Sequence, residues 1–416
     1  MKVVITNTAT LNTGDAAILI ATVEILRQAV GPELGVVIHD HQPEDARRYY
    51  PYFDFHPLLF DLLGEDNGKW GRKLSMLKVL LAAALWRSPF RRLARGLVSE
   101  PVCASLDRLA AADLIMSGGG TYLVPHYRIF PKLFELLVAS ALRRPYVLFT
   151  QSLGPFHGHS RGWLLRGVLK RARAILVRDS RSFHHLTEFG VPADRVVACA
   201  DAVFALSPEN SVFAGNGPIP RRVAISVREW PYFPTNREDG MASYREAVAA
   251  LTRHIVERYG AEVTFLSTCQ GMGEYWTDDS RVAKSIAAHL PEDVRSHVEV
   301  DSGFHSPRVL LDRYREFDLV VATRMHAAIL SLCAGVPVMP VAYEFKTTEL
   351  FSSLGLGEFV QQIDTITGER LCRSFDRFVT ERPAIQTTLA ERIAEARRSA
   401  LSAGRYVTGA LTGGTA

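Results

Sequence analysis

A short polar turn joins an apolar strand to an apolar helix in the second half of the chain. Leu319–Ala322 is predicted to be a buried strand and Met325–Ala334 a buried helix, with Thr323, Arg324 and His326 at their junction. The first turn of a helix has unpaired N–H groups and a positive dipole, which favour anions. Arginine adds a planar fork for carboxylate or phosphate, and histidine transfers protons near neutral pH. The pattern predicts an anion site with an attached acid.

A simpler interpretation gives the same three residues structural roles only. Thr323 would cap the helix, Arg324 would lie at the surface, and His326 would be a hydrogen-bonded core histidine. An isolated Arg-X-His favours that interpretation. The strand-to-helix setting favours the anion site, because parallel sheets bind ligands at the carboxyl ends of their strands. We therefore take His326 and Arg324 as the candidate catalytic pair.

The elements that would position this pair alternate between strand and helix along most of the 416 residues. Strands are predicted at Val3–Thr6, Gly35–His39, Leu114–Ser117, Tyr146–Gln151, Ala174–Arg178, Val196–Ala200, Arg222–Arg228, Glu262–Ser267, His297–Val300, Leu319–Ala322 and Val336–Val341. Helices are predicted between most of them, for example at Asp15–Val30, Gly162–Arg173, Ser180–Phe189, Ala242–Tyr259 and Asp278–Leu290. This alternation predicts an α/β fold with parallel, doubly wound, Rossmann-like sheets.

The length predicts two such domains, because a single core stops growing near about 250–300 residues. Nine of the fourteen residues in 207–220 are Ser, Asn, Gly or Pro, which is typical of a linker. The predicted parts are an N-terminal domain at 1–206, the linker, a C-terminal domain at 221–384, and a final segment at 385–416. The final segment is expected to form a helix that packs back on the N-terminal domain, with a disordered tail from residue 411. The reaction is expected in the cleft between domains.

Polar loops follow the predicted strands of both domains. In the N-terminal domain the candidate ligand-binding residues are Asn12, Gly14, Asp15, Gly118, Gly119, Gln151, Arg178 and Asp201. Structural alternatives stay open for most of them: Asp15 as a helix cap, the glycines as sites of close backbone approach, an Arg178–Asp179 pair, and Asp201 as a turn residue. In the C-terminal domain Arg228, Tyr343 and Lys346 are predicted at the same sheet edge as Arg324. The three cations among these residues, Arg228, Arg324 and Lys346, would together suit a small, multiply charged anion.

Composition limits the class of protein. The apolar fraction of 47% and the charged fraction of 22% are those of an ordinary globular protein, and a net charge of +4 gives no reason to expect a nucleic-acid partner. The five cysteines are scattered, without a CxxC pair, which favours a reducing cytosol. The first residues are predicted to be a strand and not a signal peptide. Neither an HExxH motif nor clustered carboxylates occur, so we expect no metal.

The segment Lys69–Arg95 has a marked charge bias, with eight cations and no carboxylate around an apolar run. The run is too short to cross a bilayer. Within the predicted insert at 43–98, it is either a helix lying at a membrane surface, with Trp86 at headgroup level, or a core helix with a solvated basic face. The two interpretations have equal support from the sequence.

An ordered set of motifs resembles the polysaccharide pyruvyl transferase family over about residues 3–360. The matching motifs are Asn12-Thr13-Gly14-Asp15-Ala16-Ala17-Ile18-Leu19, Ser117-Gly118-Gly119-Gly120, Gln151-Ser152-Leu153-Gly154-Pro155, Val177-Arg178-Asp179, Asp201-Ala202-Val203-Phe204, Ser226-Val227-Arg228, Thr323-Arg324-Met325-His326 and Gly335-Val336-Pro337-Val338, followed by Tyr343 and Lys346. The chain departs from the family at Ala16, where an acidic residue is often found, and in the insert at 43–98.

The resemblance implies a GT-B-like architecture and phosphoenolpyruvate as the donor, with no further cofactor. The product would be a pyruvate ketal on a saccharide acceptor. Arg228, Arg324 and His326 would bind the donor, aided by Thr323, Tyr343 and Lys346, and His326 would be the acid. The N-terminal candidates would bind the acceptor. The basic, apolar stretch favours a lipid-linked acceptor and a place at the inner face of the cell membrane.

Two rival functions stay open. A GT-B glycosyltransferase would use a nucleotide sugar, but Glu344, Glu349 and Glu358 do not have the E-x7-E spacing that many of these enzymes carry. A saccharide-binding homologue would have lost catalysis altogether. Phosphate release from phosphoenolpyruvate separates the transferase from both rivals.

Overall fold

The chain forms two compact units. The computed structural model describes every residue except 65–67, 126, 157–161, 211, 214–216, 218, 235 and 413–416. The first unit consists of Met1–Thr10, Ile18–Ala205 and Ser399–Ala416, and the second consists of Leu11–Ala17 and Leu206–Arg398. Residues 11–17, predicted to belong to the N-terminal domain, therefore group with the second unit.

The first unit is built on a parallel sheet. Its strands are β1 (Lys2–Thr8), β2 (Gly35–Asp40), β3 (Asp54–Pro57), β4 (Leu114–Ser117), β5 (Gly120–Leu123), β6 (Tyr146–Leu153), β7 (Ala174–Val177) and β8 (Val196–Ala198). The order is β3-β2-β1-β4-β6-β7-β8, with β5 beside β6. In this order β1 lies between β2 and β4, so the direction of winding reverses between β1 and β4.

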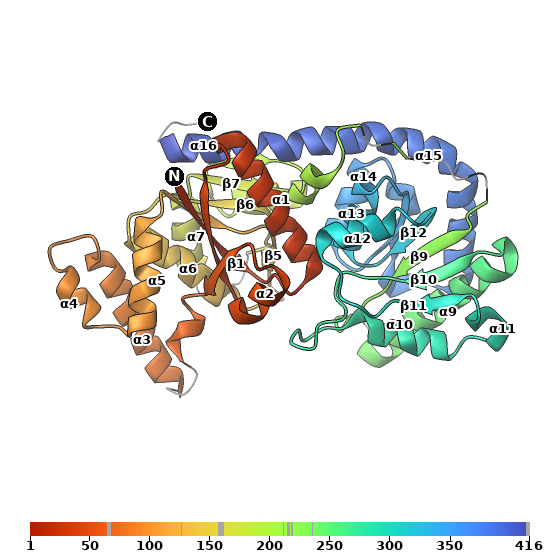
Figure 1. The fold of residues 1–416 in the computed structure, drawn as a ribbon, viewed down its shortest axis with the longest axis horizontal. Coiled ribbons are helices and arrows are strands. Elements are labelled where there is room, and N and C mark those ends of the chain that lie inside the picture. The colour runs from red at the N-terminus through yellow and green to blue at the C-terminus, as the bar shows by residue number, and fades with distance from the viewer. Residues whose placement is uncertain are drawn as a thin grey trace. The chain divides into compact units, whose positions relative to one another are not determined.

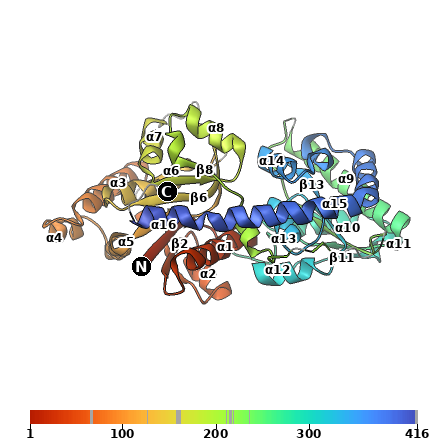
Figure 2. The ribbon, with the colours of Figure 1, turned by 90° about the horizontal axis from the view of Figure 1, so that it is seen from above.

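Helices cover both faces of this sheet, with α1 and α2 on one face and α6 and α7 on the other (Figure 2). The bounds are α1 (Thr13–Val30), α2 (Pro43–Tyr49), α3 (Gly68–Leu85), α4 (Arg91–Arg95), α5 (Glu100–Ala111), α6 (Ile129–Ala141), α7 (Gly162–Arg171) and α8 (Ser180–Glu188). Burial on both faces explains why β7 is apolar throughout, and β4 apolar up to its last residue, without alternation.

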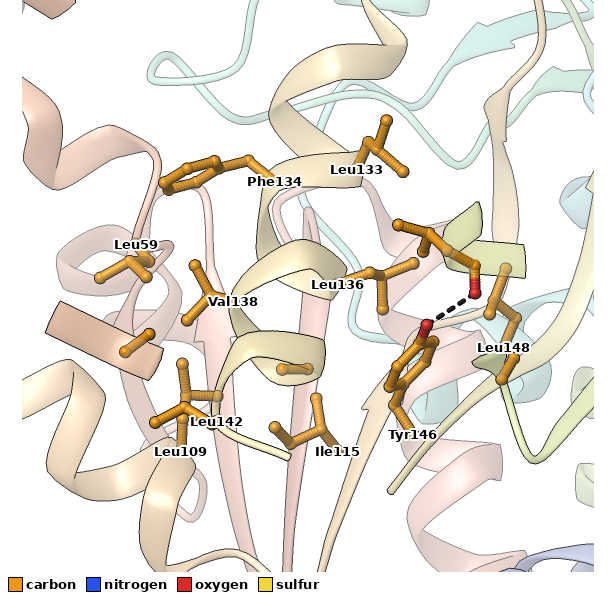
Figure 3. Packing of buried hydrophobic residues seen from close by; sticks show 14 of the residues in the cluster. Leu59, Leu109, Ile115, Leu133, Phe134, Leu136, Val138, Leu142, Tyr146 and Leu148 are labelled. Carbon is orange, nitrogen blue, oxygen red and sulfur yellow. Dashed lines mark hydrogen bonds between the residues drawn. The ribbon is translucent and has the colours of Figure 1, made fainter. Parts of the chain in front are cut away.

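The core of the first unit lies around α6. Leu133, Leu136 and Val138 of this helix are buried against Ile115 of β4 and Leu148 of β6 (Figure 3). The hydroxyl of the buried Tyr146 donates to the carbonyl oxygen of Val168 over 2.6 Å, which satisfies its polar end within the apolar cluster.

The second unit has a six-stranded parallel sheet of the same winding (Figure 1). Its strands are β9 (Arg222–Ser226), β10 (Glu262–Phe265), β11 (Val298–Val300), β12 (Leu319–Ala322), β13 (Val338–Ala342) and β14 (Gln361–Gln362). Its helices are α9 (Arg237–Tyr259), α10 (Asp279–Ala288), α11 (Glu292–Arg295), α12 (Pro307–Tyr314), α13 (Met325–Cys333) and α14 (Phe345–Ser353). The order β11-β10-β9-β12-β13-β14 places the reversal between β9 and β12.

The predicted α/β fold with two doubly wound sheets is confirmed, but three strands were missed. Strands β3, β5 and β14 are short and carry polar residues, so the sequence shows no apolar run there. Several predicted strands also end earlier, as β9 does at Ser226 and β10 at Phe265. The residues predicted at the ends of these strands belong to the loops that follow, because the ladder of hydrogen bonds to the neighbouring strands ends before them.

The chain ends in two helices, α15 (Gly368–Ser402) and α16 (Gly404–Thr412). The predicted final segment began at residue 385, whereas α15 begins seventeen residues earlier and continues through Pro383. From Ser399 onward the chain belongs to the first unit, where the Ser399 hydroxyl accepts from the Ala200 amide. Leu411 and Thr412 are helical and not part of a disordered tail, and 413–416 lie outside the described residues. The predicted linker at 207–220 is only partly described.

Candidate active site

Four neighbouring strands of the second unit end at one edge of its sheet, in the order β10, β9, β12 and β13. Arg228 follows β9, Arg324 and His326 follow β12, and Tyr343 and Lys346 follow β13. Parallel strands bring their carboxyl ends together, and a reversal of winding such as that between β9 and β12 opens a crevice there. The predicted donor residues therefore share one sheet edge.

Arg324 is held by a buried carboxylate that the sequence analysis did not identify. The Arg324 Nε and Nη2 atoms donate to the two carboxylate oxygens of Asp279, over 2.8 and 2.6 Å. The Asp279 side chain is completely buried and that of Arg324 is 11% exposed. Burial alone would lower the pKa of Arg324, but the Asp279 carboxylate more than offsets this and holds the pKa well above its usual range. This bidentate pair fixes the plane of the guanidinium and leaves its Nη1 edge unused by Asp279.

Asp279 is in turn held by Ser267, just beyond β10, which is hydrogen-bonded to Ser226 at the end of β9. The Ser267 hydroxyl donates to Asp279 over 2.7 Å and lies 2.9 Å from the Ser226 hydroxyl. Asp279 opens α10, where Asp278 caps the helix by accepting from the Ser280 amide. The sequence feature that could have indicated this carboxylate is the pair Asp278-Asp279 at the start of a predicted helix. It was not used, because either residue could have been a simple cap.

His326 lies in the first turn of α13, directly against Gly14 in the first turn of α1. A Cβ atom on Gly14 would lie 2.8 Å from both Cβ and Nδ1 of His326, closer than any real Cβ contact. Only glycine therefore fits beside this imidazole. Packing against His326 therefore explains the glycine at position 14. The prediction that Gly14 also contacts an acceptor stays a prediction.

The start of α1, which carries Gly14, is hydrogen-bonded to other segments of the second unit. The Thr13 amide donates to the Thr268 carbonyl oxygen over 3.1 Å, and the Thr13 hydroxyl donates to the His305 carbonyl oxygen over 3.0 Å. Asn12 caps α1, because its side-chain oxygen accepts from the Gly14 amide over 2.9 Å. The prediction that Asp15 is the cap was wrong, since Asp15 is already the third residue of the helix.

Cys269 and Tyr275 add protonated groups near Arg324 and Asp15. Burial raises the pKa of Cys269 to about 12, so its thiol is protonated at neutral pH and is not a nucleophile. Burial likewise raises the pKa of Tyr275 well above its usual range, and this tyrosine hydrogen-bonds to the Asn12 side chain. Neither residue was predicted, because both lie in a loop without an apolar pattern.

Arg228 lies over two aromatic rings. Its guanidinium carbon is 4.0 Å from the centroid of the Tyr343 ring and 5.0 Å from that of Trp230. Stacking on aromatic faces orients a guanidinium without neutralising its charge. Among the contacts described, Arg228 therefore differs from Arg324 and Lys346. Its charged group lies against aromatic rings, whereas theirs lie against carboxylates.

Two other predicted donor residues have different surroundings from those expected. The Lys346 ammonium lies 2.6 Å from a Glu344 carboxylate oxygen, with both side chains almost buried. The Thr323 hydroxyl bonds to the buried Tyr244 hydroxyl over 2.7 Å, and Arg324 itself occupies the cap position of α13. The prediction that Thr323 caps the helix was wrong, because its side chain satisfies Tyr244 instead.

These pairings change the electrostatics that the sequence suggested. Three cations (Arg228, Arg324 and Lys346) face two carboxylates (Asp279 and Glu344), so the five side chains carry a net charge of +1 and not +3. A site for an anion remains, but its attraction is set by oriented donors and helix N-termini more than by net charge.

Arg178 and Asp201 of the first unit form a buried ion pair. Arg178 also donates to the Ser152 hydroxyl over 3.0 Å and to the Thr121 hydroxyl over 2.7 Å. Asp201 accepts from the Val203 amide, and Asp179 caps α8 by accepting from the Ser182 amide. These bonds tie Thr121 of β5 and Ser152 of β6 to the residues that follow β7 and β8. That Arg178 and Asp201 bind a ligand stays a prediction.

The glycines of the first unit are packed against protein atoms. A Cβ atom on Gly119 would lie 2.6 Å from the Ile18 side chain, and one on Gly118 would lie 3.3 Å from the Thr6 carbonyl oxygen. The buried Gln151 amide donates to the Gly118 carbonyl oxygen over 2.8 Å. The alternative that these loops allow close approach of the protein's own atoms describes them better than ligand contact does.

A polar cluster at the ends of β1 and β2 was missed. Asn7, in the left-handed region with φ 64°, donates to the Ser117 hydroxyl, and its buried Oδ1 atom has no hydrogen-bond partner. Asp40 accepts from the Thr8 hydroxyl over 2.6 Å and from the Thr10 amide over 3.0 Å. The cluster lies where the winding of the first sheet reverses, between β1 and β4. The sequence feature that could have indicated it is the polar end of the otherwise apolar strand β1.

Metal-binding clusters and membrane-spanning helices are both absent from the described residues. They contain no group of three or more His, Cys, Asp or Glu side chains placed to hold a metal ion. Among their helices, none combines the length and the apolar character needed to cross a membrane.

Comparison with known proteins gives a family match over most of the chain. The sequence profile described as polysaccharide pyruvyl transferase matches residues 12–344. The amylovoran biosynthesis protein AmsJ of Erwinia amylovora is 25% identical over 309 residues, which cover 70% of each chain.

Solved structures resemble the fold at low sequence identity. The UDP-GlcNAc 2-epimerase of Neisseria meningitidis, bound to UDP-GlcNAc, has a TM-score of 0.59 and 10% identity, covering 99% of this chain and 100% of its own. Anabaena Alr3699/HepE in complex with UDP has a TM-score of 0.57 and 12% identity, with the same coverage. At these identities the likeness concerns the fold alone, and the fold is that of the GT-B proteins.

Proposed function

The chain belongs to the polysaccharide pyruvyl transferase family, and from this premise we propose that it transfers the pyruvyl group of phosphoenolpyruvate to a saccharide as a ketal. The observation that carries the proposal is the arrangement at the carboxyl edge of the second sheet. There an arginine is fixed by a buried carboxylate, and two residues later a histidine lies against Gly14.

The residues at this edge suit the donor. Arg324 presents the Nη1 edge of a fixed guanidinium, and Arg228 presents a charge stacked on Tyr343. Phosphoenolpyruvate carries a carboxylate and a phosphate on one carbon, so two guanidinium groups at one edge match its two anionic ends. Lys346, held by Glu344 at the start of α14, would bind the phosphate together with the first amides of that helix.

The chemistry requires a proton on the methylene carbon. In our proposal His326 gives its proton to that carbon, which becomes a methyl group, and the carbon bearing phosphate becomes an oxocarbenium ion. A saccharide hydroxyl then bonds to this carbon, and its proton returns to His326. A positioned acid of this kind typically contributes about 10²–10⁴-fold to the rate.

Phosphate then leaves and a second hydroxyl closes the ketal. The carbon–oxygen bond to phosphate breaks, the second hydroxyl oxygen bonds to the same carbon, and the proton of that hydroxyl ends on the phosphate. One donor and one diol thus give one ketal and one hydrogen phosphate. Arg228, Arg324 and Lys346 stabilise the departing charge without forming covalent bonds, which is electrostatic catalysis by groups fixed in advance.

The proposal is tested by incubating the full-length protein with phosphoenolpyruvate and a panel of saccharides, free and lipid-linked, and measuring phosphate. Phosphate released only when an acceptor is present supports pyruvyl transfer. A thermal stabilisation by UDP- or GDP-sugars, with no phosphate from phosphoenolpyruvate, would instead identify a glycosyltransferase. Saccharide binding without either result would identify a non-catalytic relative.

A further inference from the structure

Helix α3 has two apolar sides, and the core accounts for only one of them. Val79, Ala82, Ala83 and Trp86 are buried in the core of the first unit. On the other side Trp70, Leu74, Leu77 and Leu81 are 82%, 54%, 64% and 49% exposed. Their spacing of four, three and four residues places them on one face of the helix. The prediction that Trp86 lies at headgroup level was wrong, because this side chain is buried and its Nε1 donates to Asp107 over 2.9 Å.

Two more exposed apolar side chains follow α3 in the sequence. Phe90 is 61% exposed and Leu93, in α4, is 64% exposed. Figures 1 and 2 show α3 and α4 at the periphery of the first unit, beyond α5. We call Trp70, Leu74, Leu77, Leu81, Phe90 and Leu93 the apolar stripe. A row of exposed apolar side chains on one helix face, such as that of α3, marks a surface that contacts another protein or a membrane.

Unpaired cations border the apolar stripe. Asp107 pairs with Arg91 and Arg95, and Glu100 also pairs with Arg95, so two carboxylates offset these two arginines. In the part of the chain that the structure describes, no carboxylate pairs with Lys73, Lys78, Arg87 or Arg92. Arg87 donates only to the backbone carbonyl oxygens of Leu142 and Arg143, over 3.5 and 3.4 Å. A surface that covers the stripe must therefore also accept positive charge at its border.

We propose that the apolar stripe of α3 and α4 docks the protein on an anionic lipid surface. Trp70 and the leucines would enter the boundary between headgroups and acyl chains, and Lys73 and Lys78 would reach the phosphates on either side. The buried face of α3 fixes the helix to the fold, so the surface is already formed before binding. This inference does not depend on the proposed reaction.

The test is co-sedimentation of the full-length protein with phosphatidylcholine vesicles, alone or mixed with phosphatidylglycerol. Binding is expected only with the anionic mixture and should weaken as salt is added. Each cation near an anionic surface is worth about a five-fold change in partitioning, so the Lys73→Glu/Lys78→Glu variant should bind about 25-fold or more weakly. The matched control is Lys170→Glu/Arg171→Glu on α7, which should bind like the wild type.

A second variant tests the apolar part separately. Leu74→Gln/Leu77→Gln keeps every charge and should still weaken binding by about ten-fold or more. Trp163→Ser, another exposed aromatic position, is its control. Tryptophan emission should shift to shorter wavelength on binding, and Trp70→Phe should abolish the shift while the protein still sediments with vesicles.

Three results would overturn the inference. One is the absence of co-sedimentation at low salt. Another is equal loss of binding in the α7 control. The third is a wild-type dimer in analytical ultracentrifugation that Leu74→Gln/Leu77→Gln converts to monomer, because a second copy of the chain would then be the body that covers the stripe. Unchanged melting temperatures of all variants exclude unfolding as the cause of any loss.

Discussion

Asp279 shows how a single buried residue determines what its neighbours can do. It fixes both donors on one side of Arg324 and is itself held by the Ser267 hydroxyl. A guanidinium that cannot rotate loses little entropy when it binds an anion. The cost is a charge that must stay paired, because a buried charge without its partner is strongly destabilising.

Asp279→Asn should therefore lower both stability and activity. Removal of the carboxylate leaves Arg324 without its buried partner, and the free energy of unfolding should fall by about 3–5 kcal/mol. Chemical denaturation measures the fall. The control is Asp312→Asn, which breaks the exposed Asp312–Arg315 pair and should cost about 0–1 kcal/mol. Equal losses in the two variants would show that Asp279 does not have this role.

His326→Gln should separate chemistry from binding. A glutamine of similar length cannot supply a titrating proton, so phosphate release should fall by about 10²–10⁴-fold. Phosphoenolpyruvate binding, measured by calorimetry, should change much less, since the arginines remain. A variant that binds the donor normally and turns over at the wild-type rate would exclude His326 as the acid.

Sequence reasoning at the residue scale identified the strand-to-helix junction of Arg324 and His326 but not the partners of its charges. Periodicity and spacing show where a strand ends, and strand ends are where polar loops meet. They do not show that Asp279 and Glu344 pair with Arg324 and Lys346, because those contacts depend on side-chain directions. For the same reason Arg178 and Asp201 could be placed at a sheet edge without showing that they pair with each other.

At the scale of elements, the start of α1 and the start of α13 meet in the contact between Gly14 and His326. The start of α1 is held by Thr13, whose amide and hydroxyl donate to the carbonyl oxygens of Thr268 and His305. The packing contact with Gly14 therefore limits where the His326 imidazole can lie.

Gly14→Ala should reduce phosphate release while raising intrinsic helix stability. The added methyl group would occupy space 2.8 Å from His326, so the ring must shift. Alanine is otherwise favoured over glycine within a helix by about 1 kcal/mol. Gly167→Ala in α7 is the matched control, since its nearest neighbour is 3.5 Å away at the end of a flexible arginine. Equal activity of the two variants would show that Gly14 does not constrain His326.

Helix α6 carries a buried acid whose titration should affect stability. Burial raises the pKa of Glu135 to about 7, although it accepts from the Phe60 amide and the Thr6 hydroxyl. The unfolded carboxyl titrates near 4.5, so the folded state holds the extra proton between the two values. Stability should therefore fall as pH rises from about 4.5 to 7, by about 3 kcal/mol from this group.

Glu135→Gln should remove that part of the pH dependence. The difference in free energy of unfolding between the variant and the wild type should grow in favour of the variant as pH rises from 5 to 8, because glutamine has no charge to bury. Urea denaturation at several pH values measures it. A constant difference across this range would mean that Glu135 titrates near its ordinary value.

At the scale of the whole molecule, the chain has two sheets of the same winding and a family match over residues 12–344. The winding could be predicted because alternating apolar strands and helices leave few topologies. The assignment of residues 11–17 to the second unit could not, since it depends on loop hydrogen bonds. The sequence did not decide whether α3 has an exposed apolar face, because a helix that is apolar on two sides has the same residue pattern as a core helix.

The most direct test of the proposed reaction follows the hydrogen atoms. The reaction is run in deuterated water with an acceptor that supports phosphate release, and the product is examined by mass spectrometry and NMR. Protonation of the methylene carbon predicts a pyruvate ketal whose methyl group has gained one deuterium for each phosphate released. A product that retains the methylene group without deuterium, or phosphate release that leaves the acceptor unchanged, would contradict pyruvyl ketal transfer by this protein.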